Sequence, residues 1–529
     1  MTGKIGELVS GSVREGLHVK LSMPNPENLE VGFPVIVEGP EYSYFCLVEN
    51  VYNEESDIAN ELAGSALSEG SVLPAIATQG FSGPVFYAKA HLRQIQRIKK
   101  SDGRVLEPQT IPPYFAESRH ATREDVELIY ERTEKSAPLG TIRGVEAFHI
   151  HLDFDKLTQK PFALFGRTGS GKSVLNKLIC LATLATDASS ILLFDMHSEY
   201  GSYSKADGSK GLKYFFPEKV HIFSLDRKNP EATTFILDPR EITPGDLLVA
   251  LQDLSGGMVD TLYNIDKWRR GRGLDLITAV DTVTVADLGE DVAHEMSLSG
   301  LKRRMTRLSR IPFLHEGKDS FGLMMERIKE GKSVILDFGD YGTDPFFYLF
   351  VANIVSRRLF ETYTERNEDL PRLTLFLEEA HKFLGPEVAS YTIFGRLARE
   401  TRKFNLILAL VDQRPSKIDD EVTSQLANRF VLSLKDPNDL EHALSGVSER
   451  GMWESIVRTI PPQVVAVIGD AIRIPTVLNV LEYSAENIEG HILGGGRLDA
   501  GKMEDITRRA GELFRRDPPP QGLSRTPQD

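Results

Sequence analysis

The segment Phe162-Ala-Leu-Phe-Gly-Arg-Thr-Gly-Ser-Gly-Lys-Ser173 decides the fold of this chain. Its last eight residues match G-x-x-x-x-G-K-[ST], and they lie between an apolar strand and an apolar helix, the context that a phosphate-binding loop requires. A chance glycine-rich turn is the weaker interpretation. Backbone N–H groups and the helix N-terminus bind phosphate in such a loop. The residues expected to bind nucleotide here are Gly166, Arg167, Thr168, Gly169, Ser170, Gly171, Lys172, Ser173 and Val174. Lys172 is expected to reach the β- and γ-phosphates of ATP, and Ser173 to ligate Mg²⁺.

Strand-like and helical runs alternate from about residue 140 onward, which is typical of a parallel sheet with crossover helices. The expected strands cover residues 161–165, 191–195, 334–337, 373–377, 406–411 and 430–434, followed by terminal strands at 464–468 and 474–480. Charged helical segments replace strands between about 240 and 320. The sequence therefore predicts an α/β ATPase domain over 141–480, with a parallel-rich sheet and a helical insertion.

The segments on either side of this domain have other patterns. Residues 1–103 contain short apolar runs separated by Gly, Pro and Asn, which predict a small β-barrel or sandwich. Residues 104–140 are rich in proline and charge and are expected to be a connector with one helix near 123–134. Residues 481–529 form a C-terminal extension, and its proline-rich tail, 517–529, is predicted to be disordered.

Composition limits the setting and the partners. The two cysteines, Cys46 and Cys180, have no metal-ligand spacing, so free thiols in a reducing, cytoplasmic compartment are expected. We find no secretory h-region and no apolar run near the roughly 20 residues that span a bilayer, so no membrane partner is expected. The net charge of −14 argues mildly against a protein coated in nucleic acid. A ring that holds DNA only in its pore needs basic residues only there.

A second motif, Leu373-Thr-Leu-Phe-Leu-Glu-Glu-Ala-His381, is an apolar strand that ends in two carboxylates. Ligand sites of α/β sheets lie at this end of the strands. Glu379 is expected to orient and polarise the attacking water, and Glu378 to hold Mg²⁺ through its water shell. Glu is one methylene longer than the usual Asp, which leaves the Mg²⁺ role of Glu378 open. A solvated acidic turn is the alternative.

A third motif, Asp195-Met-His-Ser-Glu-Tyr200, follows another strand. Asp195, His197 and Glu199 are expected to lie near the nucleotide, where they would order Mg²⁺-bound water. A separate metal site and a capped turn without a catalytic part are the alternatives.

Two further elements follow the carboxylate strand. Gln413 comes directly after the next strand, where RecA-like motors place a sensor of the γ-phosphate; an ordinary turn before Pro415 is the alternative. On a helix, a stripe about 120° wide would hold the cations Arg396, Arg399, Arg402 and Lys403. Such a stripe could supply an arginine finger to a neighbouring subunit, contact DNA, or face solvent.

Taken in order, these motifs resemble those of the HerA family of hexameric DNA translocases, in the HerA/FtsK branch of P-loop ATPases. The resemblance rests on residues 166–173, 195–200, 378–383, 397–404 and 412–416. The N-terminal segment also resembles the small β-barrel of this family, the HAS-barrel. Met196, Ser198 and Thr401 depart from the Pro, Gly and Gly that the family often has, and none of them removes a charged catalytic group.

The resemblance implies a RecA-like core, a homohexameric ring with ATP bound between subunits, and duplex DNA held in the pore without sequence preference. It makes Lys172 and Ser173 the phosphate and Mg²⁺ residues, Glu379 the catalytic carboxylate and Gln413 the sensor. Arg399 or Arg402 would be the finger acting in trans. The partners of the family are nucleases or other effectors that dock on the barrel face.

The expected function is that of an ATP hydrolase: a double-stranded DNA translocase that works with a nuclease or effector in DNA end processing or antiviral defence. The alternative is an ATP-binding ring scaffold that assembles and regulates a partner enzyme. The densest basic segments, 267–272 and 301–310, are candidate DNA contacts or solvated helix faces.

Overall fold

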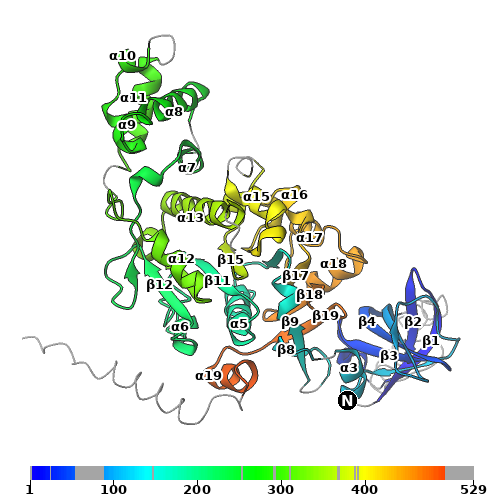
Figure 1. Cartoon of the computed structure of the whole chain (residues 1–529). Coiled ribbons are helices and arrows are strands. Elements are labelled where there is room, and N and C mark those ends of the chain that lie inside the picture. Colours follow the sequence, from blue (N-terminus) through cyan, green and yellow to red (C-terminus); the bar gives the residue numbers. More distant parts are fainter. Residues whose placement is uncertain are drawn as a thin grey trace, which may run out of the picture. The chain divides into compact units, whose positions relative to one another are not determined.

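The computed structural model describes residues 3–494 apart from 24, 54–87, 131, 146–147, 252–253, 290–293, 309–310, 366–369, 387–388 and 390–391. The chain divides into two compact units, Met1–Leu481 and Glu482–Asp529 (Figure 1). In the second unit, the described part holds the short helix α19 (Ala485–Asn487) and a π-helical turn, η6 (Ile488–Ile492). The tail predicted to be disordered, 517–529, lies outside the described residues.

The N-terminal sheet closes on itself and forms the expected small barrel. Its order is β2-β1-β7-β3-β4-β5-β6, and β2 also pairs with β5. The strands are β1 (Lys4–Ser12), β2 (Gly16–Leu21), β3 (Pro34–Glu38), β4 (Tyr42–Asn53), β5 (Ala88–Lys99), β6 (Val105–Leu106) and β7 (Glu117–His120), with a 3-10 turn, η1 (Pro26–Asn28). Their inward side chains, among them Leu17, Val19, Val35 and Val37, are fully buried. These residues build one apolar core.

The barrel extends beyond the boundary expected at residue 103, because β7 pairs with both β1 and β3. The sequence of β7, Glu-Ser-Arg-His, has no apolar alternation and therefore gave no strand signal. Polar contacts hold it instead: Ser118 Oγ donates to the carbonyl of Gly6 (2.9 Å). After β7, helix α3 (Arg123–Ile129) begins with a capping box formed by Thr122 and Asp125.

The second sheet forms the core of the predicted α/β domain and has the order β13-β12-β14-β11-β15-β16-β10-β17-β18-β19-β8-β9 over the described residues. Pairing is parallel from β13 to β17 and antiparallel from β17 to β9. Its strands are β8 (Ser136–Ile142), β9 (His149–Asp153), β10 (Phe162–Phe165), β11 (Ser190–Asp195), β12 (Val220–Ser224), β13 (Thr233–Thr234), β14 (Ser333–Asp337), β15 (Leu373–Glu378), β16 (Leu406–Asp412), β17 (Asn428–Leu432), β18 (Val464–Gly469) and β19 (Thr476–Val480). The eight expected strands are confirmed within two residues at each end. The α/β, parallel-rich fold class is therefore confirmed.

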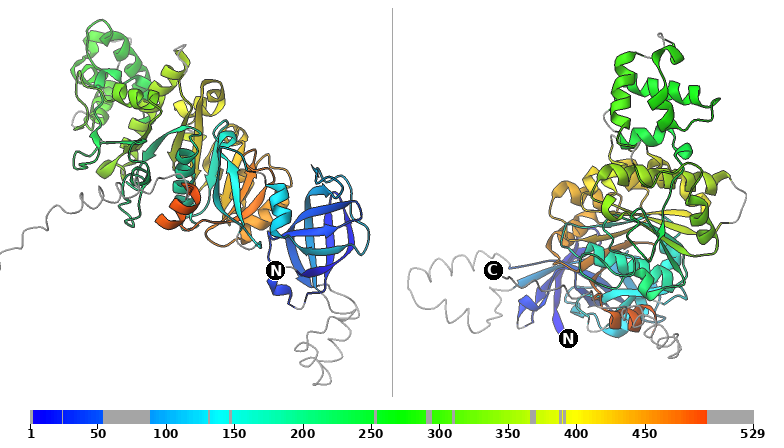
Figure 2. Two further views of the ribbon diagram at one scale, coloured as in Figure 1. Left: turned by 60° about the horizontal axis from the view of Figure 1, so that its bottom comes forward. Right: turned by 90° about the vertical axis from the view of Figure 1, so that its left-hand side faces the viewer.

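Helices lie on both sides of this sheet (Figures 1 and 2). They are α4 (Phe154–Leu157), α5 (Lys172–Ala185), α6 (Leu212–Phe215), α12 (Phe321–Lys329), α13 (Pro345–Glu365), α14 (His381–Leu384), α15 (Ile393–Glu400), α16 (Asp420–Ser424), α17 (Pro437–Ala443) and α18 (Arg450–Thr459). Short 3-10 turns are η2 (Pro239–Glu241), η3 (Gly339–Tyr341), η4 (Thr401–Phe404) and η5 (Pro415–Lys417). In the part of the chain that is described, every helix is too short or too polar to cross a membrane.

Between β13 and β14 the chain forms the helices α7 (Pro244–Ala250), α8 (Gly256–Arg269), α9 (Leu276–Thr282), α10 (Val285–Leu288) and α11 (Glu295–Met305). Capping boxes at Thr243 and Thr284 begin two of them. Leu262, Ile265 and Leu301 are fully buried. This helical insertion therefore has an apolar core of its own.

Candidate nucleotide-binding site

The phosphate-binding loop leaves the sheet where the strand order changes direction. Strand β10 lies between β16 and β17, both of which come later in the chain. Helix α5 follows the loop directly (Figure 1). The Gly166 N–H donates to the Asp412 carbonyl and the Arg167 N–H to the Ser433 carbonyl, each at 3.2 Å. These hydrogen bonds join the start of the loop to the ends of both neighbouring strands. Open α/β sheets bind ligands in the crevice at such a point.

The backbone of this loop needs its glycines. Gly171, at the N-cap of α5, has φ of 99° in the left-handed region, which glycine adopts without strain. A Cβ on Gly166 would lie 2.7 Å from Ser170 Oγ. That Oγ donates to the Arg167 carbonyl (2.7 Å) and ties the loop together. Arg167, Thr168 and Gly169 are exposed at the tip.

Lys172 and Ser173 occupy the first turn of α5, where Lys172 is half-buried and Ser173 is exposed. Val174, the last residue of the expected loop, is half-buried in the same turn. The free N–H groups of this turn and the helix dipole favour a phosphate. Burial raises the pKa of Glu378, and the positive charge of Lys172 lies close enough to that carboxyl to oppose the rise.

Three of the predicted elements meet at one edge of the sheet. In the parallel register Phe165 pairs with Asp412, and Glu378 pairs with Val411. The segments that follow these strands, which include Glu379 and Gln413, therefore leave the sheet beside the phosphate-binding loop. Glu379 itself has φ of 50°, in the left-handed region that non-glycine residues seldom adopt.

A hydrogen-bonded chain joins these three elements. The Thr168 hydroxyl donates to Gln413 Oε1 (2.7 Å), and Gln413 Nε2 donates to Glu379 Oε2 (3.2 Å). The predicted sensor thus contacts both the phosphate-binding loop and the predicted catalytic carboxylate. A side chain in this position can transmit a change at the loop to Glu379.

A His–Asp pair that the sequence did not predict lies beside Glu379. His381 Nδ1 lies 2.9 Å from Asp412 Oδ2 and 3.7 Å from Glu379 Oε2. Asp412 is fully buried and also accepts the backbone N–H groups of His381 (2.7 Å) and Arg414 (2.6 Å). The hydrogen bond to Asp412 raises the pKa of His381 above its ordinary value, although burial opposes the shift. Both residues lie in the motif segments, so their position after two adjacent strands was the available signal.

Two buried side chains, Tyr200 and Asn176, hold the carboxyl of Glu378 in place. The Tyr200 hydroxyl donates to Glu378 Oε1, and Asn176 Nδ2 donates to that hydroxyl (2.8 Å). Burial raises the pKa of Glu378 to about 8, and the charges of Asp195 and Glu199 add to this effect. A divalent cation would favour the ionised form, because its charge counteracts both causes.

Within the third motif, Asp195 orders the loop. Its two carboxylate oxygens accept the N–H groups of Glu199 and Tyr200, both at 2.9 Å. Asp195 is buried, and burial raises its pKa to about 7. His197 is exposed and Glu199 half-buried. Within the described residues, no three His, Cys, Asp or Glu side chains form a group that could hold a metal ion.

The two candidate arginine fingers lie away from these contacts. Arg399, in α15, pairs with Glu421 (2.8 Å) and is 40% exposed. Arg402 lies in η4, and its side chain is outside the described residues. Arg396 pairs with Glu400 and lies over the ring of Phe360. None of these contacts joins the candidate fingers to the phosphate-binding loop of this chain.

The basic segments make many contacts inside the helical insertion. Arg269 and Arg270 both bind Asp266, and Arg269 also donates to the carbonyl of Ile242. In the second segment, Lys302 donates to the carbonyls of Asp281 and Val283, while Arg307 pairs with Asp344. Lys267 and Arg303 are exposed. Arg310, the last residue of that segment, is outside the described residues.

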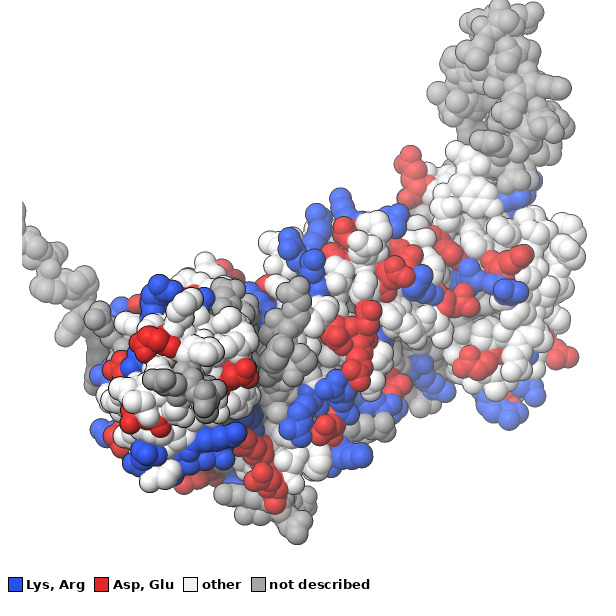
Figure 3. Space-filling view, turned by 90° about the horizontal axis from the view of Figure 1, so that it is seen from above, with Lys and Arg blue, Asp and Glu red and all other residues white. Residues whose placement is uncertain are grey.

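Lys and Arg lie among Asp and Glu on the face seen in Figure 3. The face therefore presents cations and anions together, and a basic segment in the sequence does not by itself mark a DNA-binding surface.

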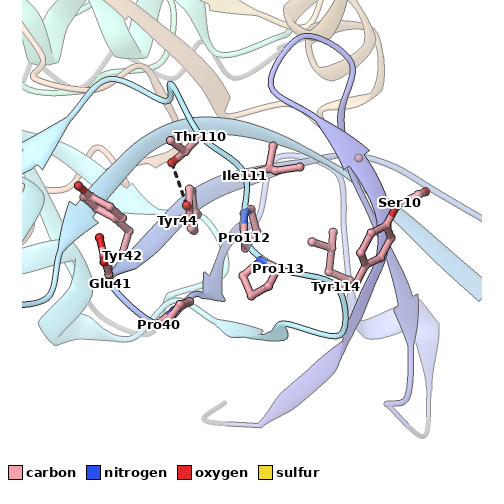
Figure 4. A pocket seen from close by; sticks show the side chains of 12 residues that line it. Ser10, Pro40, Glu41, Tyr42, Tyr44, Thr110, Ile111, Pro112, Pro113 and Tyr114 are labelled. Atoms are coloured by element: carbon pink, nitrogen blue, oxygen red, sulfur yellow. Dashed lines mark hydrogen bonds between the residues drawn. The ribbon is translucent and has the colours of Figure 1, made fainter.

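A separate hollow of about 470 Å³ lies on the barrel (Figure 4). Its lining includes Tyr42, Tyr44, Ile111 and Tyr114, and Tyr44 hydrogen-bonds to Thr110 (2.9 Å). Ile111 and Tyr114 are 46% and 73% exposed. No sequence pattern predicted this apolar surface.

Comparisons with known proteins agree with these motifs. A family model described as the central domain of the helicase HerA matches residues 137–359. The DNA double-strand break repair helicase HerA of Sulfurisphaera tokodaii is 24% identical over 530 residues, covering 96% of this chain and 97% of that protein. Its counterpart from Pyrococcus furiosus is 23% identical over 432 residues, covering 74% of this chain and 77% of that protein.

Among solved structures, VirB4 of Thermoanaerobacter pseudethanolicus is 12% identical, with a TM-score of 0.49, over 68% of this chain and 99% of that chain. The family match includes the phosphate-binding loop and the Asp195 motif, and the similarity to the Sulfurisphaera protein extends over nearly the whole chain. The chain is thus similar to the HerA family of P-loop ATPases, both in its central domain and over most of its length.

Proposed function

We propose that this protein hydrolyses ATP to translocate along duplex DNA, as a homohexameric ring that works with a nuclease or another effector. The observation that carries the proposal is the hydrogen-bonded chain from Thr168 through Gln413 to Glu379. It joins a phosphate-binding loop, a sensor and a carboxylate at one sheet edge, which are the parts that ATP hydrolysis needs.

The residues present fit ATP and Mg²⁺. The glycine loop and the first turn of α5 offer backbone N–H groups to phosphate oxygens, and Lys172 adds a positive charge. The Ser173 hydroxyl and the Glu378 carboxylate are the hard oxygen donors that Mg²⁺ prefers. When bound, Mg²⁺ would neutralise charge on the phosphates. Glu379 orients the attacking water and accepts its proton, and Gln413 responds to the γ-phosphate.

The ring supplies the rest of the proposal. ATP lies between subunits, and Arg399 or Arg402 reaches the nucleotide of the neighbouring subunit. Asp195, His197 and Glu199 form the outer layer of the same site. Duplex DNA passes through the pore without sequence-specific contacts. Similarity to the HerA family supports this arrangement, and the relatives from Sulfurisphaera and Pyrococcus are named DNA double-strand break repair helicases.

In this function the effector docks on the barrel face. The complex acts in the cytoplasm, in DNA end processing or antiviral defence. The barrel hollow supports a partner surface, because Ile111 and Tyr114 expose apolar area there. Replacing Tyr114 by Asp should then prevent capture of the effector and leave the ATPase rate of the isolated ring unchanged.

A second candidate function is a ring scaffold that binds ATP and regulates its partner enzyme. The net charge of −14 and the ion pairs of Arg269, Arg270 and Arg307 favour it, since a carboxylate already neutralises each of these cations.

The ATPase rate with and without linear duplex DNA separates the two functions. It should be measured for wild type and Glu379→Gln, at low and physiological salt, with Glu127→Gln, an exposed residue of the barrel-side helix α3, as the matched control. Strong stimulation by DNA that Glu379→Gln abolishes supports the motor. Turnover that ignores DNA favours the scaffold.

A further inference from the structure

A buried polar chain lies directly beneath the nucleotide site. It begins at Asn176, one turn after Lys172 in α5, passes through the Tyr200 hydroxyl and ends at the carboxylate of Glu378. Asn176 and Tyr200 are both 0% exposed. This hydrogen-bonded chain therefore links α5 to the strand end that carries Glu378, through side chains alone.

The position of the Tyr200 hydroxyl is fixed by its surroundings. The Tyr200 N–H is bound by Asp195 at the end of β11, and the Tyr200 carbonyl accepts the N–H of Leu212 (2.9 Å). Strand β11 is the neighbour of β15, which carries Glu378. Because backbone and ring are both held, the hydroxyl reaches across to the adjacent strand end at a defined place.

Glu378 needs such a restraint. Glu has one more rotatable bond than Asp, so an unrestrained Glu carboxylate samples more positions than an Asp carboxylate. The hydrogen bond from Tyr200 engages Oε1 and leaves Oε2 available. Tyr348 donates to the Glu378 carbonyl (2.9 Å) and restrains the backbone of the same residue. The longer side chain can then act from a single position.

We propose that Tyr200 is a positioning residue for Mg²⁺ binding, which fixes the Glu378 carboxylate and is itself tied by Asn176 to the phosphate-binding helix. The inference deepens the proposed function and rests on its assignment of Glu378 to Mg²⁺. It explains how this chain uses Glu at a position where Asp is usual. These hydrogen bonds join Glu378 to α5, so the residues proposed to bind nucleotide and metal belong to one connected unit.

The test uses the full-length protein and the variant Tyr200→Phe, which keeps the ring and removes the hydroxyl. Affinity for a fluorescent ADP analogue is titrated without Mg²⁺ and over a series of Mg²⁺ concentrations. Without Mg²⁺ the affinity should stay within about twofold of wild type. The Mg²⁺ concentration for half-maximal enhancement should rise about tenfold, which is the scale of one hydrogen bond to a charged group.

Tyr363→Phe is the matched control, because this buried phenol donates only to the carbonyl of Pro371 (3.0 Å). It should leave both affinities unchanged. A merely structural role of the Tyr200 hydroxyl would lower the unfolding temperature and leave the Mg²⁺ titration at its wild-type position. That result would overturn the inference.

The variant Glu378→Gln separates this inference from the proposed function. If Glu378→Gln leaves the Mg²⁺ titration unchanged, the assignment of Glu378 to Mg²⁺ fails, and the inference fails with it. If Glu378→Gln shifts the titration and Tyr200→Phe does not, only the inference fails. In the Glu378→Gln background, Tyr200→Phe should add little further shift. If Tyr200→Phe does not fold, Asn176→Leu takes its place in the test. The Mg²⁺ titration of Asn176→Leu should shift in the same direction by a smaller amount. An unchanged titration would overturn the inference.

Discussion

The phosphate-binding edge of the ATPase sheet and the helical insertion both concentrate charged side chains, but they use them differently. At the sheet edge, Glu379, His381 and Asp412 are held at the ends of adjacent strands, where a ligand can reach Glu379. In the insertion, Asp266 binds Arg269 and Arg270 within the same helix and its end. Charge at a strand end thus indicates chemistry more reliably than charge along a helix, because the sheet determines which groups face one another.

The largest effect is expected at the sheet edge. Glu379→Gln keeps the shape and the contact with Gln413 but removes the base, so turnover should fall by a factor of about 10² to 10⁴. Nucleotide affinity should remain near wild type, as measured by titration with a fluorescent analogue. Turnover at the wild-type rate would show that another residue is the base.

In the insertion, Asp266→Ala should act on stability. It leaves Arg269, which is 14% exposed, without its carboxylate. Breaking such a buried pair costs about 3 to 5 kcal/mol, so denaturant unfolding of the insertion should shift to a lower concentration. Basal ATPase should persist. The control is Asp260→Ala, which removes an exposed carboxylate from the same helix; an equal loss in both variants would contradict this account of Asp266.

The exposed cations of the insertion sharpen the comparison further. Lys267→Ala should weaken duplex-DNA binding equally for unrelated sequences and reduce the salt slope of the affinity by about 1. Arg307→Ala, in which the lost cation is paired with Asp344, should change the slope less. The measurement is DNA affinity over a salt series. A flat salt response of the wild type would contradict DNA binding through phosphate contacts.

The smallest effect concerns pH. The contact with Asp412 raises the folded-state pKa of His381 above its ordinary value of 6.5. The stabilisation is therefore complete below pH 6.5 and is lost as pH rises through the raised pKa. The difference in unfolding free energy between wild type and His381→Asn should shrink over that window. A difference that grows with pH would reverse the sign assigned to this pair.

Most of the ATPase sheet could be predicted because buried parallel strands are nearly continuous apolar runs. Strand β15, Leu-Thr-Leu-Phe-Leu-Glu, is such a run and begins at the expected residue. Strand β7 lacks that pattern, since its polar side chains are satisfied by Gly6, Glu38 and Asp125. No local property of its four residues reveals that Gly6 and Glu38, which are distant in the sequence, lie beside them.

The candidate site also contains residues that the sequence predicts and contacts that it does not. Lys172, Glu379 and Gln413 were proposed from the sequence because each follows a recognisable strand, and their roles stay predictions. The partners of His381 and Glu378 were missed, since Asp412 and Tyr200 meet them only after the strands are in register. The basic segments were the least informative part, because composition does not show that Arg269 binds Asp266.

At residue 379, stability and activity favour different amino acids. A φ of 50° costs a residue with a Cβ about 1 kcal/mol or more, and glycine or asparagine would occupy the position with less strain. Screening variants for heat resistance alone should therefore enrich Gly or Asn at 379 and yield stable proteins that no longer turn over ATP. A designer who stabilises this chain should hold residue 379 fixed and seek the gain elsewhere.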